Sequence, residues 1–190
     1  MSVRQPAIPQ DMQSIVDELA RSEREARELI EGLTDEQLNW QPNGAAWSMA
    51  RCLDHLARIN TTYTVALRTA VRESDPSRVP RRAPISPGWF SRFFIHMMDA
   101  PPRRKFSAPT QAIPFLYING EDALKSFVDS HDEVRALVVE SVNVDLNRIR
   151  FKNPFVRFLA FTVGAGFLII SAHDRRHLWQ ARQVRNALPR

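Results

Sequence analysis

The chain has 190 residues, of which 44% are hydrophobic and 25% charged, and its formal net charge is +5. These values fit a soluble globular protein, and we expect residues 1–190 to form a single domain with a sizeable core. The one cysteine, Cys52, excludes an intramolecular disulfide, and residues 1–10 contain no apolar run typical of a signal peptide. We therefore expect a cytoplasmic protein.

The first half of the chain contains two amphipathic segments with helical periodicity. Residues 9–31 place apolar side chains at helical spacing, and Gly32 follows as a helix stop. Residues 34–37, Thr-Asp-Glu-Gln, have the spacing of a capping box at a short turn. A second helix is predicted from Ser48, its N-cap, to about residue 74.

The second half contains two further helical patterns, over residues 120–142 and 155–186. Arg157 interrupts the apolar start of the last one, which leaves less than the roughly 20 residues of a membrane span, so no span is predicted. Residues 75–118 hold eight of the thirteen prolines. Because proline is excluded from helix interiors, this segment is predicted to be a long irregular connection with a short helical piece near residues 89–98.

Three histidines have the spacing of a metal site. His173 and His177 lie at positions i and i+4 and share one face of the last helix, while His55 lies in the second helix. Three imidazoles from two facing helices can bind one divalent metal and leave a coordination position for water or substrate, as in catalytic sites. Imidazole ligands suit zinc, nickel, iron and copper, so they do not distinguish among these metals.

The positions of these histidines along their helices predict the order of the helices in the bundle. At 1.5 Å per residue, His55 lies roughly 11 Å from the start of its helix and His177 roughly 14 Å from the end of its own. The side chains can meet only if the second and fourth helices are antiparallel, which requires a long crossover between the second and third. Residues 75–118 stand where that crossover is needed. The predicted fold is therefore an all-α four-helix bundle of up-down-down-up topology.

Two short motifs resemble those of a known family. Trp47-Ser48 followed by Asp54-His55-Leu56, and the run from His173 to Leu178, resemble the DinB/YfiT-like family of metal-binding four-helix bundles, over roughly residues 15–185. The resemblance implies a divalent metal held by His55, His173 and His177. Some relatives are thiol-dependent transferases in which the metal activates a low-molecular-weight thiol, so the resemblance favours a small-molecule substrate of that kind.

Other polar residues near these motifs are candidates for lesser roles. His131 and Glu23 interrupt the apolar stripes of their helices, and either is a candidate pocket base. Cys52 shares the face of His55, where a buried packing residue is a better interpretation than a fourth ligand. Asp174 is expected on the solvent-facing surface, with a hydrogen bond to a neighbouring imidazole as the alternative. Further residues expected to face solvent are His96, Arg175 and Arg176. The alternative for either arginine is to hold an anionic group of the substrate, if the open metal position faces it.

The run from His173 to His177 also has the outline of the HExxH motif of zinc proteases. Two features argue against that class. Asp174 replaces the catalytic glutamate and shortens the reach of the base, and residues 178–190 contain no histidine or acid to serve as a third ligand. A protease is therefore not the preferred interpretation.

We predict a metal-dependent enzyme, S-transferase-like, and the alternatives are a metal-dependent hydrolase and a non-catalytic metal-binding or ligand-binding bundle. A homodimer is a candidate assembly. The positive charge is concentrated in residues 72–105, which contain eight basic residues and three acidic residues. No nucleic-acid-binding motif accompanies this segment, so we expect a solvated arginine-rich connection and no nucleic-acid partner.

Overall fold

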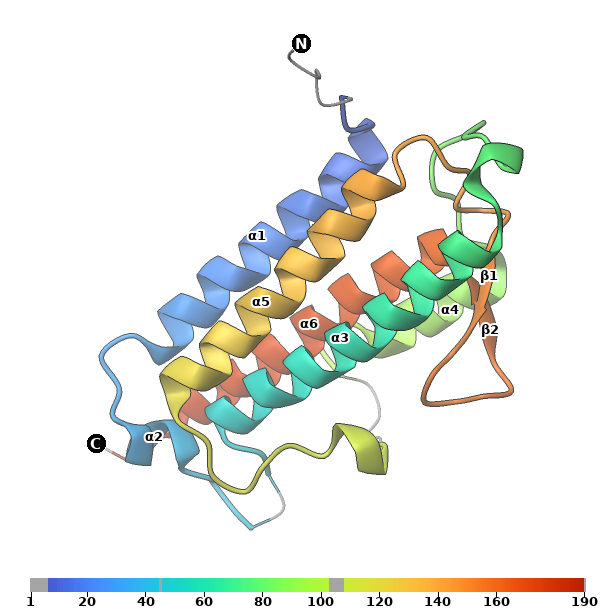
Figure 1. Ribbon diagram of the computed structural model, residues 1–190. Coiled ribbons are helices and arrows are strands. Elements are labelled where there is room, and N and C mark those ends of the chain that lie inside the picture. The colour runs from blue at the N-terminus through green and yellow to red at the C-terminus, as the bar shows by residue number, and fades with distance from the viewer. Residues whose placement is uncertain (1–6, 45, 103–107, 190) are drawn as a thin grey trace.

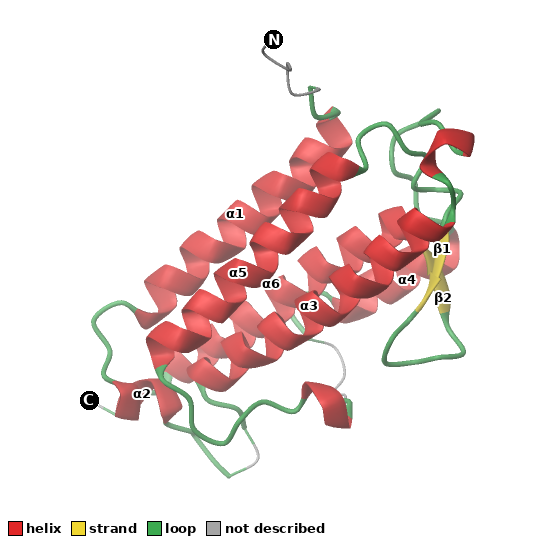
Figure 2. Ribbon diagram, viewed as in Figure 1, coloured by secondary structure: helices red, strands yellow, loops and turns green. Residues whose placement is uncertain are grey.

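Four long helices form a bundle in the computed structural model of the protein, which describes residues 7–44, 46–102 and 108–189 (Figure 1). The four helices are α1 (Gln10–Ile30), α3 (Met49–Glu73), α5 (Gly120–Glu140) and α6 (Val163–Asn186). Figure 2 shows that helices dominate the fold and that one small pair of strands stands beside the bundle. The predicted all-α class is confirmed.

The helices begin where the sequence supplies caps. Side chains of Ser48, Asn119 and Thr162 accept hydrogen bonds from first-turn amides of α3, α5 and α6. The predicted capping box is present at Thr34 and starts the short helix α2 (Asp35–Asn39). Such caps satisfy amide groups that have no partner inside the helix. The first three long helices agree with their predicted bounds to within two residues.

The directions of α3, α5 and α6 confirm the predicted topology. Trp47, just before α3, stacks on His177, whereas Leu67 near the end of α3 packs beside Gly166 in α6, so these two helices are antiparallel. The starts of α3 and α5 share one core cluster and their ends share another, so these two are parallel.

The first helix completes the order. Arg175 forms an ion pair with Glu18, and Arg182, one heptad later, forms one with Glu25. The same spacing on both helices means that α1 and α6 run parallel. The bundle is therefore up-down-down-up, which brings the start of α3 beside the C-terminal half of α6.

Residues 75–118 form the predicted crossover between α3 and α5. Its described part contains two single 3-10 turns, η1 (Pro76–Arg78) and η2 (Thr110–Ala112), and the helix α4 (Trp89–Met98), which matches the predicted helical piece. α4 packs along α6 on the outside of the bundle. Residues 103–105, the last cations of the predicted basic segment, lie outside the described residues.

The last helix begins later than predicted. α6 starts at Val163, and residues 155–162, which we expected to be helical, belong instead to a hairpin of β1 (Arg150–Lys152) and β2 (Ala160–Thr162). The strands are antiparallel, with Phe151 opposite Phe161. Among the described helices, none has the length and apolar character needed to cross a bilayer.

The side chain of Asn153 explains why the hairpin forms. Its oxygen accepts hydrogen bonds from the amides of Phe155 and Val156, and its amide group donates to the Tyr63 hydroxyl at 2.6 Å. These bonds turn the chain directly after β1. An apolar run suits a buried strand as well as a buried helix, so periodicity could not distinguish the two here.

Candidate metal centre

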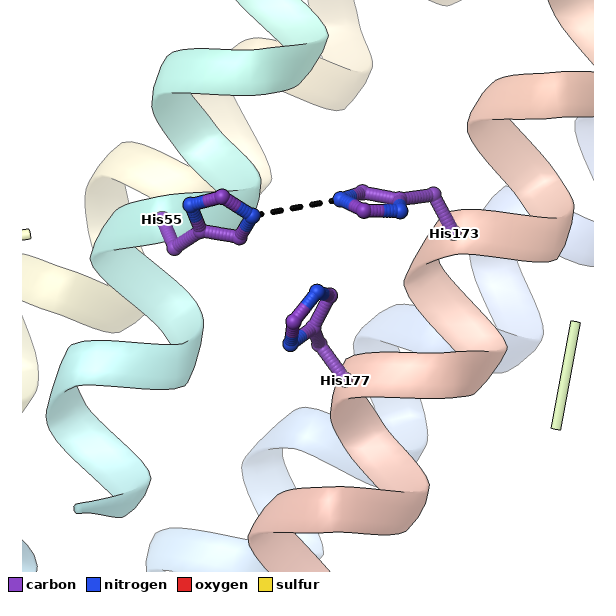
Figure 3. Close-up of side chains that lie close together, drawn as sticks. All are labelled: His55, His173 and His177. Atoms are coloured by element: carbon purple, nitrogen blue, oxygen red, sulfur yellow. Dashed lines mark hydrogen bonds between the residues drawn. The ribbon is translucent and has the colours of Figure 1, made fainter. Parts of the chain in front are cut away.

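The three predicted histidines converge between α3 and α6. One ring nitrogen from each of His55, His173 and His177 lies within 4.8 Å of the other two. Figure 3 shows the His55 ring reaching from α3 toward the two rings on α6. His173 and His177 come together because they lie one turn apart on the same helix face, with ring centroids 4.6 Å apart.

The geometry of His55 suits a metal ligand. Its Nδ1 lies 2.6 Å from the carbonyl oxygen of Ala112. Since a carbonyl only accepts, Nδ1 carries the proton and Nε2 keeps its lone pair. Nε2 lies 3.2 Å from Nε2 of His173. Two nitrogens bound tetrahedrally at 2.0–2.1 Å to one metal would be about 3.3 Å apart. The bond to a backbone carbonyl is the usual support of a metal-binding imidazole.

The surroundings favour the neutral form of all three imidazoles. Burial lowers the pKa of His55, His173 and His177. Neighbouring imidazoles and the Arg176 guanidinium act in the same direction on His173 and His177, and together with burial they lower the pKa of His173 to about 3. Neutral imidazole is the form that binds a metal, so the site is prepared for a cation without losing protons.

Two neighbours of the histidines have distinct roles. The Trp47 ring centroid lies 4.7 Å from that of His55 and 5.6 Å from that of His177, so this side chain forms one wall of the site. Cys52 is fully buried in the core, and burial raises the pKa of its thiol to about 12. It lies outside the histidine group, as expected for a packing residue.

The two candidate bases, His131 and Glu23, belong to a different polar group. Nδ1 of His131 lies 3.0 Å from a carboxylate oxygen of Glu23, and its Nε2 lies 3.0 Å from Asp174. Asn60 donates to the other oxygen of Asp174, and Arg135 donates to Glu23. This group, hereafter the buried polar network, connects all four long helices. His131 and Glu23 are therefore not found together with the three converging histidines.

The expectation that Asp174 faces solvent was wrong. Its side chain is fully buried and accepts hydrogen bonds from α3 and α5. The alternative expectation, a hydrogen bond between Asp174 and an imidazole, is met, but the imidazole is that of His131 rather than that of His173 or His177. The sequence held one signal: polar residues interrupt the apolar stripes at Asn60 and His131, and buried polar groups need partners.

The two arginines between the histidines are also less exposed than expected. Arg175 is half-buried and pairs with Asp99 of the crossover and Glu18 of α1. Arg176 is buried and donates to the carbonyl of Met97 at 3.3 Å. α4 and the residue after it cover this part of α6, which no helical periodicity could reveal. His96 is exposed, as expected.

Comparisons with known proteins agree with this architecture. The model of the DinB superfamily matches residues 18–181. The uncharacterized protein YuaE of Bacillus subtilis is 25% identical over 162 residues, which cover 85% of this chain and 91% of YuaE. The solved structure of YfiT from Bacillus subtilis, described as "a probable metal-dependent hydrolase with an unusual four-helix bundle topology", matches with a TM-score of 0.61 at 12% identity, over 96% of this chain and 90% of YfiT. Because the family match spans most of the residues that form the bundle, the chain belongs to the DinB superfamily.

Proposed function

We propose that the protein is a metal-dependent enzyme that binds one divalent metal through His55, His173 and His177 and acts on a small molecule. One observation carries this proposal: three imidazoles, all favoured in their neutral form, offer ring nitrogens within 4.8 Å of one another. Three protein ligands are typical of catalytic sites, whereas structural sites are usually closed by four. Zinc, nickel and iron are the candidate metals.

The preferred reaction is transfer of a low-molecular-weight thiol to an electrophile. A divalent metal with neutral ligands supplies Lewis acidity, which favours the deprotonated form of a thiol or of water. Nearby carboxylates are already engaged: Asp54 pairs with Arg58 and accepts from the amide of Phe115, and Asp174 belongs to the buried polar network. A thiol, with a pKa of about 8.5, needs less help from a base than water does.

The residues that follow η2 favour a small substrate that has an apolar part, because their exposed side chains could contact it. Ala112, whose carbonyl holds His55, is followed at once by exposed apolar side chains. Phe115 is anchored there because Arg58 lies 4.3 Å from its ring centroid. A substrate that reaches the histidines beside this segment would gain apolar contacts, which are favourable in proportion to the area removed from water. The exposed residues are Ile113, Phe115, Leu116 and Tyr117.

Hydrolysis is the second candidate, because YfiT, which shares the fold, is described as a probable metal-dependent hydrolase. The same metal and the same histidines would then activate water instead of a thiol. A non-catalytic metal-binding bundle is the third.

The test is an activity assay on protein purified without a histidine tag and loaded separately with zinc, nickel or iron. A panel of low-molecular-weight thiols is combined with a chromogenic aryl halide, and nitrophenyl esters serve as hydrolase substrates. We expect thiol conjugation that is lost on chelation and in His177→Ala but kept in His96→Ala. Ester hydrolysis with the same dependence would replace thiol transfer by hydrolysis. Tight metal binding with neither activity would support the non-catalytic bundle.

A further inference from the structure

Two segments at one end of the bundle are rich in basic residues. Residues 76–98 and 146–162 contain eight basic residues and no acidic residue. We call these two segments the basic cap. Its cations are Arg78, Arg81, Arg82, Arg92, Arg148, Arg150, Lys152 and Arg157.

The fold brings the two segments together although they are distant in sequence. Pro80 and Val144 form a β-bridge at the border of the cap. The amide of Ser86 donates to the side chain of Asn147 at 2.8 Å. On α4, the ring of Phe90 stacks on Phe161 of β2, with centroids 5.8 Å apart and planes 9° apart. Figure 1 shows α4 and the hairpin at the same end of the molecule. The charges of both segments therefore act at one end of the bundle.

Most of these cations are not neutralised by the protein itself. Arg78 pairs with Asp75, and Arg81 pairs with Asp11. Among the described residues, no carboxylate lies within ion-pair distance of the other six. Arg92 and Arg150 donate to backbone carbonyls, of Pro87 and Ala160, which leaves their charge in place. The basic cap thus presents a positive surface to any partner.

Large apolar side chains stand out from the same elements. Trp89 and Phe93 lie one turn apart on α4 and are 81% and 59% exposed, while Phe158 in the hairpin turn is 86% exposed. The other side of α4 is packed, since the ring of Phe94 lies 4.8 Å from that of Phe161. The outer face of α4 therefore alternates aromatic side chains with Arg92 and His96. Helices that lie in a membrane interface likewise combine exposed aromatic side chains with basic residues, although in α4 both kinds stand on the outer face.

We propose that the basic cap binds the surface of membranes that contain anionic phospholipids. The cations would contact lipid phosphates, and Trp89, Phe93 and Phe158 would enter the boundary between headgroups and acyl chains. The attachment is peripheral and needs no spanning helix. A second copy of the chain is a poor occupant, because a twofold contact through the cap would place like charges against each other. Single-stranded nucleic acid would stack its bases on aromatic side chains along a basic groove. Here the aromatic side chains stand on an outer helix face and at a hairpin turn.

The test is co-sedimentation of the full chain with vesicles of phosphatidylcholine alone and of phosphatidylcholine mixed with an equal amount of phosphatidylglycerol. We expect binding to the mixed vesicles only, weakening as sodium chloride is added. The double variant Arg150→Glu/Arg157→Glu should bind at least about tenfold more weakly, since each surface cation contributes about 1 kcal/mol at an anionic membrane. Trp89→Ala/Phe93→Ala and Phe158→Ala should also weaken binding. The tryptophan emission should shift to shorter wavelength on binding in the wild type but not in Trp89→Phe.

Matched controls come from outside the cap. Leu116→Ser removes an apolar side chain that is 85% exposed, and Arg24→Glu/Arg27→Glu reverses two exposed charges on α1. Both should bind vesicles as the wild type does, and circular dichroism should show that all variants are folded. Equal binding to neutral and anionic vesicles, no binding to either, or equal loss in the control variants would overturn the proposal. Binding to a single-stranded oligonucleotide in place of vesicles would assign the cap to nucleic acid instead.

Discussion

Nε2 of His131 on α5 lies 3.0 Å from a carboxylate oxygen of Asp174 on α6, one residue beyond His173. Asp174 and the two converging histidines of α6 therefore point in different directions around the same helix. Because Asp174 is held by α3 and α5 through Asn60 and His131, these bonds constrain the rotation of α6 about its axis, together with the packing of α6 on its neighbours. That rotation is what directs His173 and His177 toward His55. The buried polar network thus positions the candidate metal centre without belonging to it.

The buried polar network should make the protein less stable at alkaline pH. Burial lowers the pKa of His131, but Asp174 and Glu23 outweigh it and raise this pKa to about 9. Because the folded-state pKa exceeds the usual value, the stabilisation is complete below about pH 6.5 and is lost as the pH rises through 9. The free energy of unfolding should fall by roughly 3 kcal/mol between these limits. Urea titrations across this range would measure it.

His131→Gln is the control for that prediction. It keeps a side chain that can bond to Asp174 but cannot titrate, so its stability should be nearly independent of pH in this window. Glu23 and Arg135, which also face His131, stay charged throughout it, since the pKa of Glu23 is lowered and that of Arg135 is raised. An equally steep alkaline loss in His131→Gln would show that another group is responsible.

Metal binding should require each of the three histidines. We expect one divalent metal per chain in the wild type and at least about 100-fold weaker binding in His55→Ala, His173→Ala and His177→Ala, because each change removes one ligand. Inductively coupled plasma spectrometry and competition with a chromogenic chelator would give content and affinity. His96→Ala, at an exposed position, should bind as the wild type does. Unchanged affinity in the three single variants would show that the site is wrongly assigned.

The apo protein should lose stability in acid through the same histidines. Burial lowers the pKa of His55, His173 and His177 below the usual 6.5. The unfolded chain therefore takes up protons that the folded chain does not, and this contribution falls as the pH drops below about 6.5. The metal should also dissociate as the pH falls, because protonated imidazole cannot bind it. Thermal unfolding of apo and metal-loaded protein should show the gap between the two melting temperatures closing as the pH is lowered.

Trp47 should report metal binding. Its ring contacts those of His55 and His177, so a paramagnetic metal such as nickel or copper at the histidines should quench its fluorescence. The chain has four tryptophans, so the comparison with Trp47→Phe isolates this signal. The quenching should be lost in Trp47→Phe while metal content stays close to wild type. Quenching that persists undiminished would place the metal nearer another tryptophan.

Gly166 should tolerate no side chain. A Cβ at this position would lie 2.5 Å from Leu67 Cδ2 and 2.9 Å from Phe151 Cε1, where α6 meets α3 and β1. Gly166→Ala should destabilise the fold by about 1–3 kcal/mol, the usual cost of overpacking. Gly88→Ala is the matched control, because a Cβ there meets nothing within 4 Å. Chemical denaturation of both variants would compare the two costs, and equal stability would mean that the helices separate readily at Gly166.

The sequence by itself determined the four long helices, except for the start of the last one, and the three converging histidines. Apolar periodicity and caps such as Ser48 act within a few residues, so they can be seen without the fold. The spacing of His173 and His177 is equally local. The distances of His55 and His177 from the ends of their helices, combined with the proline-rich segment 75–118, then allowed only one order of helices.

Only the tertiary structure decided which other faces of α6 are buried. In the sequence, Asp174 and Arg176 look like surface residues because both are polar and lie away from the apolar stripe. Helical periodicity locates that stripe, but it does not show which other elements pack on the remaining faces of the helix. α1, α3 and α4 all pack on α6, and α5 reaches it through the bond from His131 to Asp174, so more of its circumference is buried than one apolar stripe suggests. The hairpin before α6 depends in the same way on a distant contact, between Asn153 and Tyr63. Such long-range contacts form only when the chain is assembled.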